Sequence, residues 1–160
     1  MIFVTVGSQM PFKRLIEGVA AWAMTQSEMP NVLAQVGDME RCVPELRTVR
    51  SLSPEEFRAA VLGAEVIIAH AGMGSVLTAM EFGKPLVVLP RKGALRETRN
   101  DHQIATARWL AAKGGVFVAM EDEDLADAID RARASTRTTS QISSHASADL
   151  VEALRIFIQS

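Results

Sequence analysis

One glycine-containing turn, placed between an apolar strand and a helix, constrains the fold of this chain more than any other feature. Residues 66–69 are all apolar, and His70-Ala71-Gly72-Met73-Gly74-Ser75 follows them before a predicted helix from about Ser75 to Phe82. Glycine lets a backbone approach a ligand closely, and the free amides at a helix start favour an anion. A second apolar strand, Leu86–Leu89, comes next. The pattern predicts a phosphate or diphosphate site at the carboxyl edge of a parallel sheet.

The spacing of these glycines narrows the choice of function. It matches neither the G-x-G-x-x-G of dinucleotide-binding folds nor the G-x-x-x-x-G-K-[ST] of P-loop proteins, so neither a dinucleotide fold nor an ATPase is indicated. The alternative interpretation is a helix start whose glycines serve only close packing. The bare spacing leaves both interpretations open.

Short apolar strands alternate with helix-length amphipathic segments along the first 133 residues. This alternation predicts an α/β fold: a Rossmann-like parallel sheet with helices on both faces. Ser53-Pro54-Glu55-Glu56 is a capping box with proline at the first helical position. We expect strands at 2–6, 32–36, 47–52, 66–69, 86–89 and 116–119, and helices at about 11–25, 53–62, 75–82, 101–113 and 121–133.

Composition argues against several classes of protein. The 160 residues suit one domain, and 48% of them are hydrophobic, yet no apolar run approaches the roughly 18 to 20 residues that span a bilayer. The net charge is −2 without a basic block, so nucleic-acid binding has no support. The first residues predict a strand rather than a signal peptide, and the single cysteine, Cys42, excludes an internal disulfide and fits the cytoplasm.

The carboxyl-terminal part differs in composition from the rest. Residues 134–148 are small, polar and rich in Ser and Thr, which predicts a mobile connector after a domain that spans residues 1–133. A helix tethered by such a connector is expected to dock away from the edge of its own domain. That helix is predicted at residues 149–160, with its apolar side chains at Leu150, Val151, Leu154, Phe157 and Ile158.

Three turns follow strands and are predicted to meet at one crevice, because ligands in an open α/β sheet bind outside the carboxyl ends of the strands. The turns are Gly7-Ser8-Gln9, the stretch from His70 to Ser75, and the segment 91–103. The first offers neutral hydrogen bonds, and the second offers helix-start amides. The structural alternatives are that Ser8 caps a helix and that His70 is a hydrogen-bonded core histidine.

The segment 91–103 carries the charged and amide side chains of the expected crevice. Arg91 or Arg96 is a candidate to screen a diphosphate, and Asp101 and Gln103 are candidates to hold sugar hydroxyls. Each has a structural alternative as well. Asp101 is well placed to cap the following helix, and the two arginines also fit solvated loop charges.

Three motifs taken together resemble a known family. They are F-V-T-V-G-S-Q-x-P-F near the start, H-A-G-M-G-S followed by G-K-P-L-V-V-L-P-R in the middle, and N-D-H-Q afterwards. Over roughly residues 1–120, they resemble in order and spacing the carboxyl-terminal domain of family 28 glycosyltransferases. The likeness is greatest to stand-alone versions of that domain, which are the donor-binding subunits of two-component enzymes.

The resemblance implies the C-terminal half of a GT-B fold, which binds a UDP-sugar donor without a metal or another cofactor. A membrane-associated partner subunit is implied to bind the acceptor, a lipid-diphosphate-linked saccharide. The chain itself would then be cytoplasmic and peripheral at the inner face of the membrane. The family pattern places Gly7, Ser8 and Gln9 at the inter-domain cleft, Gly72, Met73, Gly74 and Ser75 at the donor phosphates, and His102 and Gln103 at the transferred sugar.

Two positions depart from the family pattern. Many relatives carry an acidic residue that grips the donor ribose, five positions before the glycine of the G-x-P turn. Here that position is Thr78, and Glu81 lies one helical turn later. Ribose recognition stays open between Glu81 and a contact from Thr78 or the backbone. Thr106 stands where the family has a sugar-binding Asn, so the identity of the donor sugar cannot be carried over.

These features predict an enzyme subunit that transfers a sugar from a UDP-sugar to a lipid-linked acceptor in exopolysaccharide or capsule biosynthesis. Stabilisation of the departing UDP falls to this chain. The base that activates the acceptor is either on the partner subunit or, on this chain, His70. The alternative is a non-catalytic nucleotide-sugar-binding subunit that enhances a partner glycosyltransferase. A nucleotide-sugar 2-epimerase ranks last, because that chemistry needs two complete domains.

Overall fold

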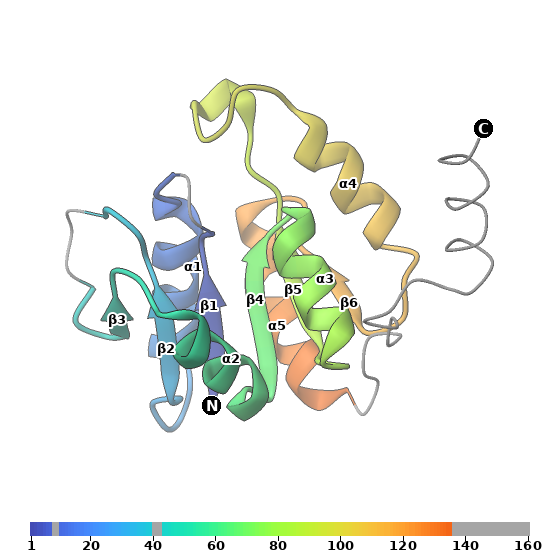
Figure 1. Cartoon of the computed structure of the whole chain (residues 1–160). Helices are drawn as coiled ribbons and strands as arrows, with labels where there is room; N and C mark the ends of the chain where they lie inside the picture. The colour runs from blue at the N-terminus through green and yellow to red at the C-terminus, as the bar shows by residue number, and fades with distance from the viewer. Residues whose placement is uncertain (8–9, 40–42, 136–160) are drawn as a thin grey trace, which may run out of the picture.

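The computed structural model describes residues 1–7, 10–39 and 43–135, and these form a six-stranded sheet in which every pairing is parallel. The strand order is β3-β2-β1-β4-β5-β6 (Figure 1). The predicted α/β class is confirmed. The strands are β1 (Ile2–Thr5), β2 (Val32–Gln35), β3 (Arg47–Val49), β4 (Val66–His70), β5 (Leu86–Leu89) and β6 (Val116–Val118).

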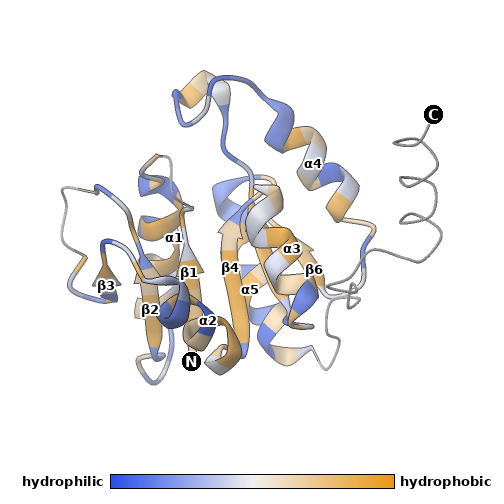
Figure 2. Ribbon diagram, in the orientation of Figure 1, coloured by the Kyte–Doolittle hydropathy of each residue, from blue (hydrophilic) through white to orange (hydrophobic). Residues whose placement is uncertain are grey.

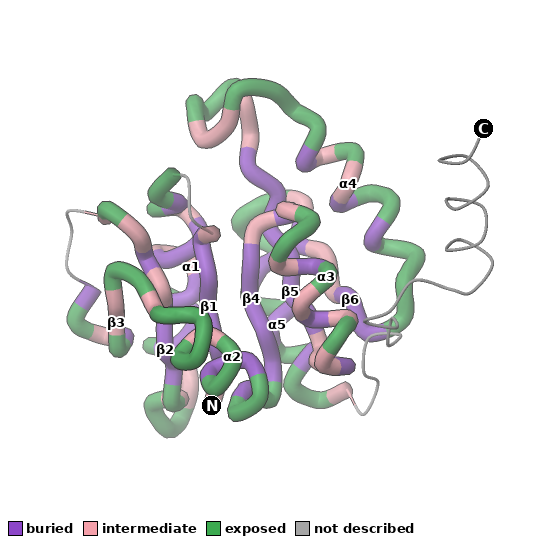
Figure 3. The backbone as a smooth tube through the Cα atoms, viewed as in Figure 1, coloured by how far each residue is buried: buried purple, intermediate pink, exposed green. Residues whose placement is uncertain are grey.

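Helices cover both faces of the sheet. Alternate side chains of β1 point to opposite faces, because the side-chain period of a strand is two. Ile2 and Val4 join one core cluster, and Phe3 between them joins the other. β1 and β5 are buried along their length, and β4 is buried up to Ala69, as expected for parallel strands covered on both sides (Figure 2, Figure 3). The first cluster contains α1 (Lys13–Met24) and α5 (Leu125–Ala134), and the second contains α2 (Pro54–Gly63), α3 (Met73–Glu81) and α4 (His102–Leu110).

The chain winds away from the middle of the sheet in two opposite directions. From β1 it continues to β2 and β3 on one side, and from β4 it continues to β5 and β6 on the other. β1 and β4 are therefore neighbours at the point where the winding reverses. In open α/β sheets this reversal leaves a crevice outside the carboxyl ends of the two strands, and it is where ligands bind.

The start of α2 confirms the predicted capping box. The Ser53 hydroxyl accepts a hydrogen bond from the Glu56 amide at 3.2 Å, and the Ser53 amide donates to the Glu56 carboxylate at 2.8 Å. These bonds lower the pKa of Glu56, with the Ser53 backbone as the larger cause. A reciprocal pair of this kind satisfies amide groups that the first turn of a helix leaves free.

Other helix ends differ from the prediction by a few residues. α3 begins at Met73, because Gly72 takes an extended conformation (φ −92°, ψ 134°) and its carbonyl accepts the first helical hydrogen bond from Val76. α4 ends at Leu110, and the Lys113 amide bonds back to the Leu110 carbonyl in a closing turn. The acidic stretch forms a short 3-10 turn, Asp122–Asp124, directly before α5.

Some predicted features lie outside the described residues. They are Ser8, Gln9 and Cys42, most of the predicted connector and the whole predicted terminal helix. Within residues 1–7, 10–39 and 43–135, no helix has the length and apolar character needed to cross a bilayer.

Candidate functional site

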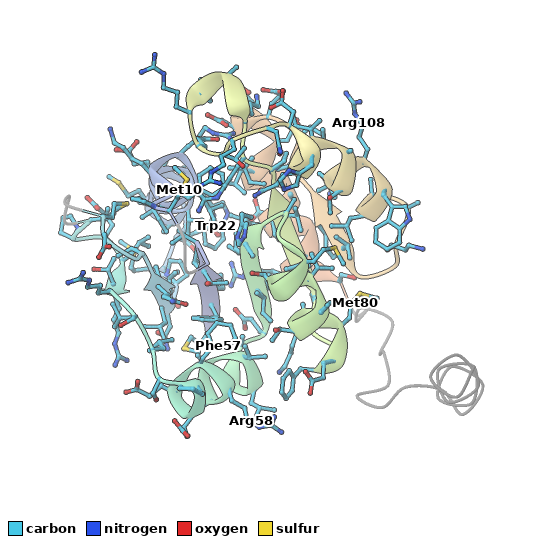
Figure 4. All side chains as sticks on the ribbon, turned by 45° about the horizontal axis from the view of Figure 1, so that its top comes forward. Met10, Trp22, Phe57, Arg58, Met80 and Arg108 are labelled. Carbon is cyan, nitrogen blue, oxygen red and sulfur yellow. The ribbon has the colours of Figure 1, made fainter. Side chains whose placement is uncertain are left out.

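A cleft of about 530 Å³ opens at the carboxyl edge of the sheet, at the reversal between β1 and β4. Figure 4 turns this edge toward the viewer, with Met10 near the start of α1 and Phe57 on α2. All three turns that the sequence predicts to converge contribute to the cleft. Its lining residues are Thr5, Val6, Gly7, Met10, Gln35, Phe57, His70, Gly72, Gly74, Ser75, Arg91, Glu97, Thr98 and Gln103.

The imidazole of His70 lies against two glycines. A Cβ atom at Gly7 would lie 2.7 Å from His70 Cε1, and a Cβ atom at Gly72 would lie 2.1 Å from His70 Nε2. Gly7 also has φ of +79°, a conformation that side chains disfavour. Both positions thus require glycine for the ring to fit. For Gly7 and Gly72, the packing interpretation of the glycines is the one that the structure supports.

Gly74 differs from these two glycines. A Cβ atom there would meet nothing within 4 Å, and its φ is not in the left-handed region. Neither packing nor backbone conformation explains a glycine at this position. It lies in the first turn of α3 and lines the cleft, so its missing side chain leaves the helix start open to a ligand.

The start of α3 offers amides to an anion. The cap residue Gly72 has no side chain, and the first turn contains no acidic residue. The amides of the first helical turn have no partner within the helix and carry the positive end of the helix dipole. The hydroxyl of Ser75, which also lines the cleft, adds a neutral hydrogen-bonding group next to them.

His70 is neutral at physiological pH. Burial lowers the pKa of His70 from the ordinary 6.5 to about 4, and the positive charge of Arg91 is a second, smaller cause. A hydrogen bond with the Thr5 backbone acts in the opposite direction and raises the pKa. Within the described residues, His70 Nδ1 is buried and has no hydrogen-bond partner. A neutral imidazole both donates and accepts, but a pKa this low makes His70 a weak base.

The buried polar side chains of the described residues all belong to the cleft. They are Thr5, Arg91 and Gln103, and each is less than 8% exposed. The Thr5 hydroxyl donates to Gln35 Oε1 at 3.1 Å and accepts from the Gly7 amide at 3.2 Å. Gln103 Oε1 accepts from the Arg91 amide at 3.1 Å, which leaves its NH₂ group as the end that can reach a ligand. Buried polar groups cost free energy unless they are paired, so the fold concentrates this cost at the cleft.

Comparison with known proteins identifies the family. The chain matches the glycosyltransferase family 28 C-terminal domain over residues 1–154. It belongs to this family. The resemblance inferred from the three sequence motifs is confirmed.

Relatives of this family 28 domain include large and small proteins. Human UDP-N-acetylglucosamine transferase subunit ALG13 is 32% identical over 126 residues, which are 72% of this chain and only 11% of the human protein. The Yarrowia lipolytica protein of the same name is 29% identical over 137 residues, 78% of this chain and 67% of that protein. The crystal structure of the glycotransferase of kitacinnamycin has a TM-score of 0.61 at 15% identity, covering 84% of this chain and 35% of that one. This likeness shows the fold, which is the C-terminal half of a GT-B fold.

Arg91 of the family 28 domain is not a solvated loop charge. It is 4% exposed, and its Nη1 donates to the carbonyls of Pro11 at 2.9 Å and Glu97 at 3.1 Å. Its Nη2 donates to the carbonyls of Val6 at 2.8 Å and Met10 at 2.6 Å. Because these four bonds occupy both ends of the guanidinium, direct screening of a diphosphate by Arg91 does not fit the structure.

Asp101 and His102 lie outside the group of cleft-lining residues, whereas Gln103 is among them. Asp101 occupies the N-cap position of α4 but makes no side-chain cap, so the capping alternative is wrong. Its Oδ1 instead accepts from the Gly93 amide at 2.8 Å, which folds the loop back on itself. The exposed ring of His102 pairs through Nδ1 with Asn100 Oδ1.

The two candidates for ribose recognition lie farther along α3 and do not line the cleft. The Thr78 hydroxyl donates to the Gly74 carbonyl at 2.9 Å. Glu81 is exposed at the last residue of α3, roughly 10 Å along the axis from Gly74 at 1.5 Å per residue. Met73, which the sequence predicts to bind the donor, is 47% exposed and also lies outside the lining.

Some cleft residues were missed from the sequence. Gln35, the last residue of β2, had a usable signal, because it stands at the carboxyl end of a predicted strand. Glu97 and Thr98 lie in a loop whose course depends on distant contacts. Phe57 reaches the cleft from α2, and its ring also packs edge-on against Phe3 at 5.3 Å between centroids. The pattern of α2 predicts only a core side chain there.

Proposed function

We propose that this chain is the donor-binding subunit of a UDP-sugar-dependent glycosyltransferase that acts on a lipid-linked saccharide acceptor in polysaccharide assembly. The observation that carries the proposal is Gly74. It leaves the first turn of α3 open to the cleft, with neither packing nor backbone conformation to account for it. Membership of family 28 and the names of the human and Yarrowia lipolytica relatives support a UDP-sugar as the donor.

The reaction consists of one displacement. The oxygen of the acceptor hydroxyl forms a bond to the anomeric carbon, the bond from that carbon to the UDP oxygen breaks, and UDP leaves with the electron pair. The hydroxyl proton passes to a base. Because negative charge grows on the departing diphosphate, the amides and positive dipole end of α3 stabilise the transition state more than the ground state.

Proton removal is assigned to a second subunit. The pKa of about 4 makes His70 a poor proton acceptor near neutral pH. The imidazole ring of His70 also packs closely against Gly7 and Gly72. His70 therefore shapes the cleft and offers a neutral hydrogen bond. The NH₂ group of Gln103 is assigned to the transferred sugar, since the Oε1 end already bonds to Arg91. In this proposal the partner is membrane-associated and binds the acceptor, and the chain works at the inner face of the membrane.

The low pKa of His70 also favours a second candidate function, a nucleotide-sugar-binding subunit that enhances a partner glycosyltransferase already containing the chemistry. The two candidates differ in one measurable way. If the partner alone transfers sugar slowly and this chain raises only the affinity for the donor, the accessory role holds. If the partner alone has no activity, the chain supplies part of the catalytic apparatus.

The test is Gly74→Ala with Gly114→Ala as the matched control. A Cβ atom at either position would meet nothing within 4 Å, but only Gly74 lines the cleft. Alanine favours helix by up to about 1 kcal/mol over glycine, so Gly74→Ala is expected to fold at least as stably as the wild type. UDP affinity, measured by calorimetry, is expected to fall roughly tenfold in Gly74→Ala and to stay unchanged in Gly114→Ala. Equal affinity in both variants would remove the basis of the proposal.

A further inference from the structure

Two arginines join the segment after β1 to the loop after β5. Arg91 donates to the carbonyls of Val6, Met10 and Pro11 in the first segment and to the carbonyl of Glu97 in the second. The carbonyls of Val6, Met10 and Pro11 lie beyond Thr5, the last residue of β1, and each accepts a hydrogen bond from the guanidinium. Both segments line the cleft on opposite sides of the β1–β4 reversal.

Arg14, near the start of α1, makes the second connection. Its Nε and Nη2 donate to the two carboxylate oxygens of Glu97, both at 2.8 Å, and Nη2 also donates to the Pro90 carbonyl at 2.7 Å. Nη1 pairs with Asp122. Burial opposes the charge of Arg14, but its bonds to Glu97 and Asp122 outweigh burial, so its pKa is raised. The Glu97 carboxylate in turn accepts from the Lys92 amide at 2.9 Å.

Phe12 ties the two arginines together. It is fully buried, and its ring centroid lies 4.6 Å from Arg91 Cζ and 5.2 Å from Arg14 Cζ. A cation over an aromatic face is attracted by the ring. We call the four residues Arg14, Phe12, Arg91 and Glu97 the arginine clamp.

Among the residues that the structure describes, no carboxylate accepts a hydrogen bond from the Arg91 side chain. Its partners are backbone carbonyls, and burial lowers its pKa, with the charge of Glu97 acting in the opposite direction. A solvated arginine would avoid that burial cost. The planar guanidinium of Arg91 donates to four carbonyls in two segments at once. The single ammonium group of a lysine cannot make these four bonds.

We propose that Arg91 is a positioning residue of the donor cleft: it holds Val6, Met10 and Pro11 against the 91–97 loop, so that the two walls are set before the donor arrives. This inference rests on the proposed function for the nature of the donor. The clamp itself is a property of the free protein. A preformed site loses less conformational entropy on binding, so the clamp raises donor affinity without touching the donor.

The experiment compares Arg91→Met, Arg91→Lys and the control Arg96→Met. Arg96, the other arginine that the sequence offered to screen a diphosphate, is exposed and does not line the cleft, so it fits a solvated charge of the same loop. In Arg91→Met, hydrogen exchange is expected to accelerate at residues 10–12 and 92–98 and to stay unchanged in β4 and β5. UDP affinity is expected to fall roughly tenfold, because the free energy of one or two hydrogen bonds corresponds to about that factor in affinity. In Arg91→Lys, local hydrogen exchange and UDP affinity are expected to stay close to those of Arg91→Met. In Arg96→Met, both are expected to match the wild type.

The outcomes separate the clamp from the proposed function. If wild-type protein does not bind UDP, the proposed donor is wrong, while faster local exchange in Arg91→Met still supports the clamp. Unchanged local exchange and UDP affinity in Arg91→Met overturn the clamp. If Arg91→Met does not fold, Arg14→Met tests the clamp from outside the cleft, since Arg14 lines no part of it. Wild-type exchange at residues 92–98 in Arg14→Met then overturns the proposal.

Discussion

The turn between β4 and α3 and the loop between β5 and α4 border the same cleft in opposite ways. The turn contributes backbone amides at the start of α3, where Gly74 places no side chain over the cleft. The loop contributes side chains, yet Arg91 is committed to backbone carbonyls and Glu97 to Arg14. At the start of α4, Gln103 Oε1 is likewise committed to the Arg91 amide. In the proposed function, the turn therefore binds the donor, and the loop supports the shape of the cleft. A charged motif in a loop is therefore weaker evidence for ligand contact than an unexplained glycine at a helix start.

The largest expected effect concerns the two glycines of the turn, which have different reasons to be glycine. Gly72→Ala places a Cβ atom 2.1 Å from His70 Nε2, so the ring or the backbone must shift. We expect the free energy of unfolding to fall by about 2–3 kcal/mol in urea denaturation. Gly74→Ala is the matched control and is not expected to lose stability. A Gly72→Ala protein as stable as Gly74→Ala would show that the ring is not confined as described.

The second prediction concerns pH and His70. Its pKa is about 4 in the folded protein and near 6.5 in the unfolded chain, so the unfolded chain takes up the proton first as the pH falls. The stability linked to His70 is therefore fully present above pH 6.5 and is lost progressively between pH 6.5 and 4. The expected loss is up to roughly 3 kcal/mol.

The measurement is the free energy of unfolding across that pH range in three proteins. His70→Gln is expected to flatten the profile, because it removes the titrating group. His102→Ala is the control, since that ring is exposed at the start of α4, and its profile is expected to follow the wild type. A profile that stays steep in His70→Gln would assign the pH dependence to another group.

The contrast between turn and loop also explains what the sequence predicts well. The strands and α2 follow from local apolar patterns and the Ser53 capping box, which involve neighbours along the chain. The Gly72–Ser75 turn was predicted as part of the cleft for the same reason. The sequence does not predict the role of Arg91, because its partners Val6 and Met10 lie 85 and 81 residues away along the chain. The sequence does not predict Glu97 as a cleft residue for the same reason, because its partner Arg14 lies 83 residues away along the chain.

A third prediction concerns the first two residues of α4, of which Gln103 lines the cleft and His102 does not. If the NH₂ group of Gln103 meets the transferred sugar, Gln103→Ala is expected to lower turnover of the reconstituted pair roughly tenfold while UDP affinity stays nearly intact. A purely structural role, through the bond to the Arg91 amide, would weaken binding of UDP and UDP-sugar alike. His102→Ala tests the family-based assignment of that residue, and the cleft geometry predicts the smaller effect.

The smallest expected effect is that of metal ions on UDP affinity. Its measurement tests whether the turn binds the negatively charged diphosphate without a divalent ion. The first-turn amides of α3 supply hydrogen bonds and a positive dipole end, which is enough to bind phosphate groups in other helix-start sites. We therefore expect UDP affinity to change by less than about twofold between EDTA and excess magnesium, well under the tenfold effect of a lost contact. Backbone chemical shifts of Gly74 and Ser75 should move on UDP addition in EDTA. Strict dependence of these shifts on a divalent ion would mean that the amides do not hold the diphosphate by themselves.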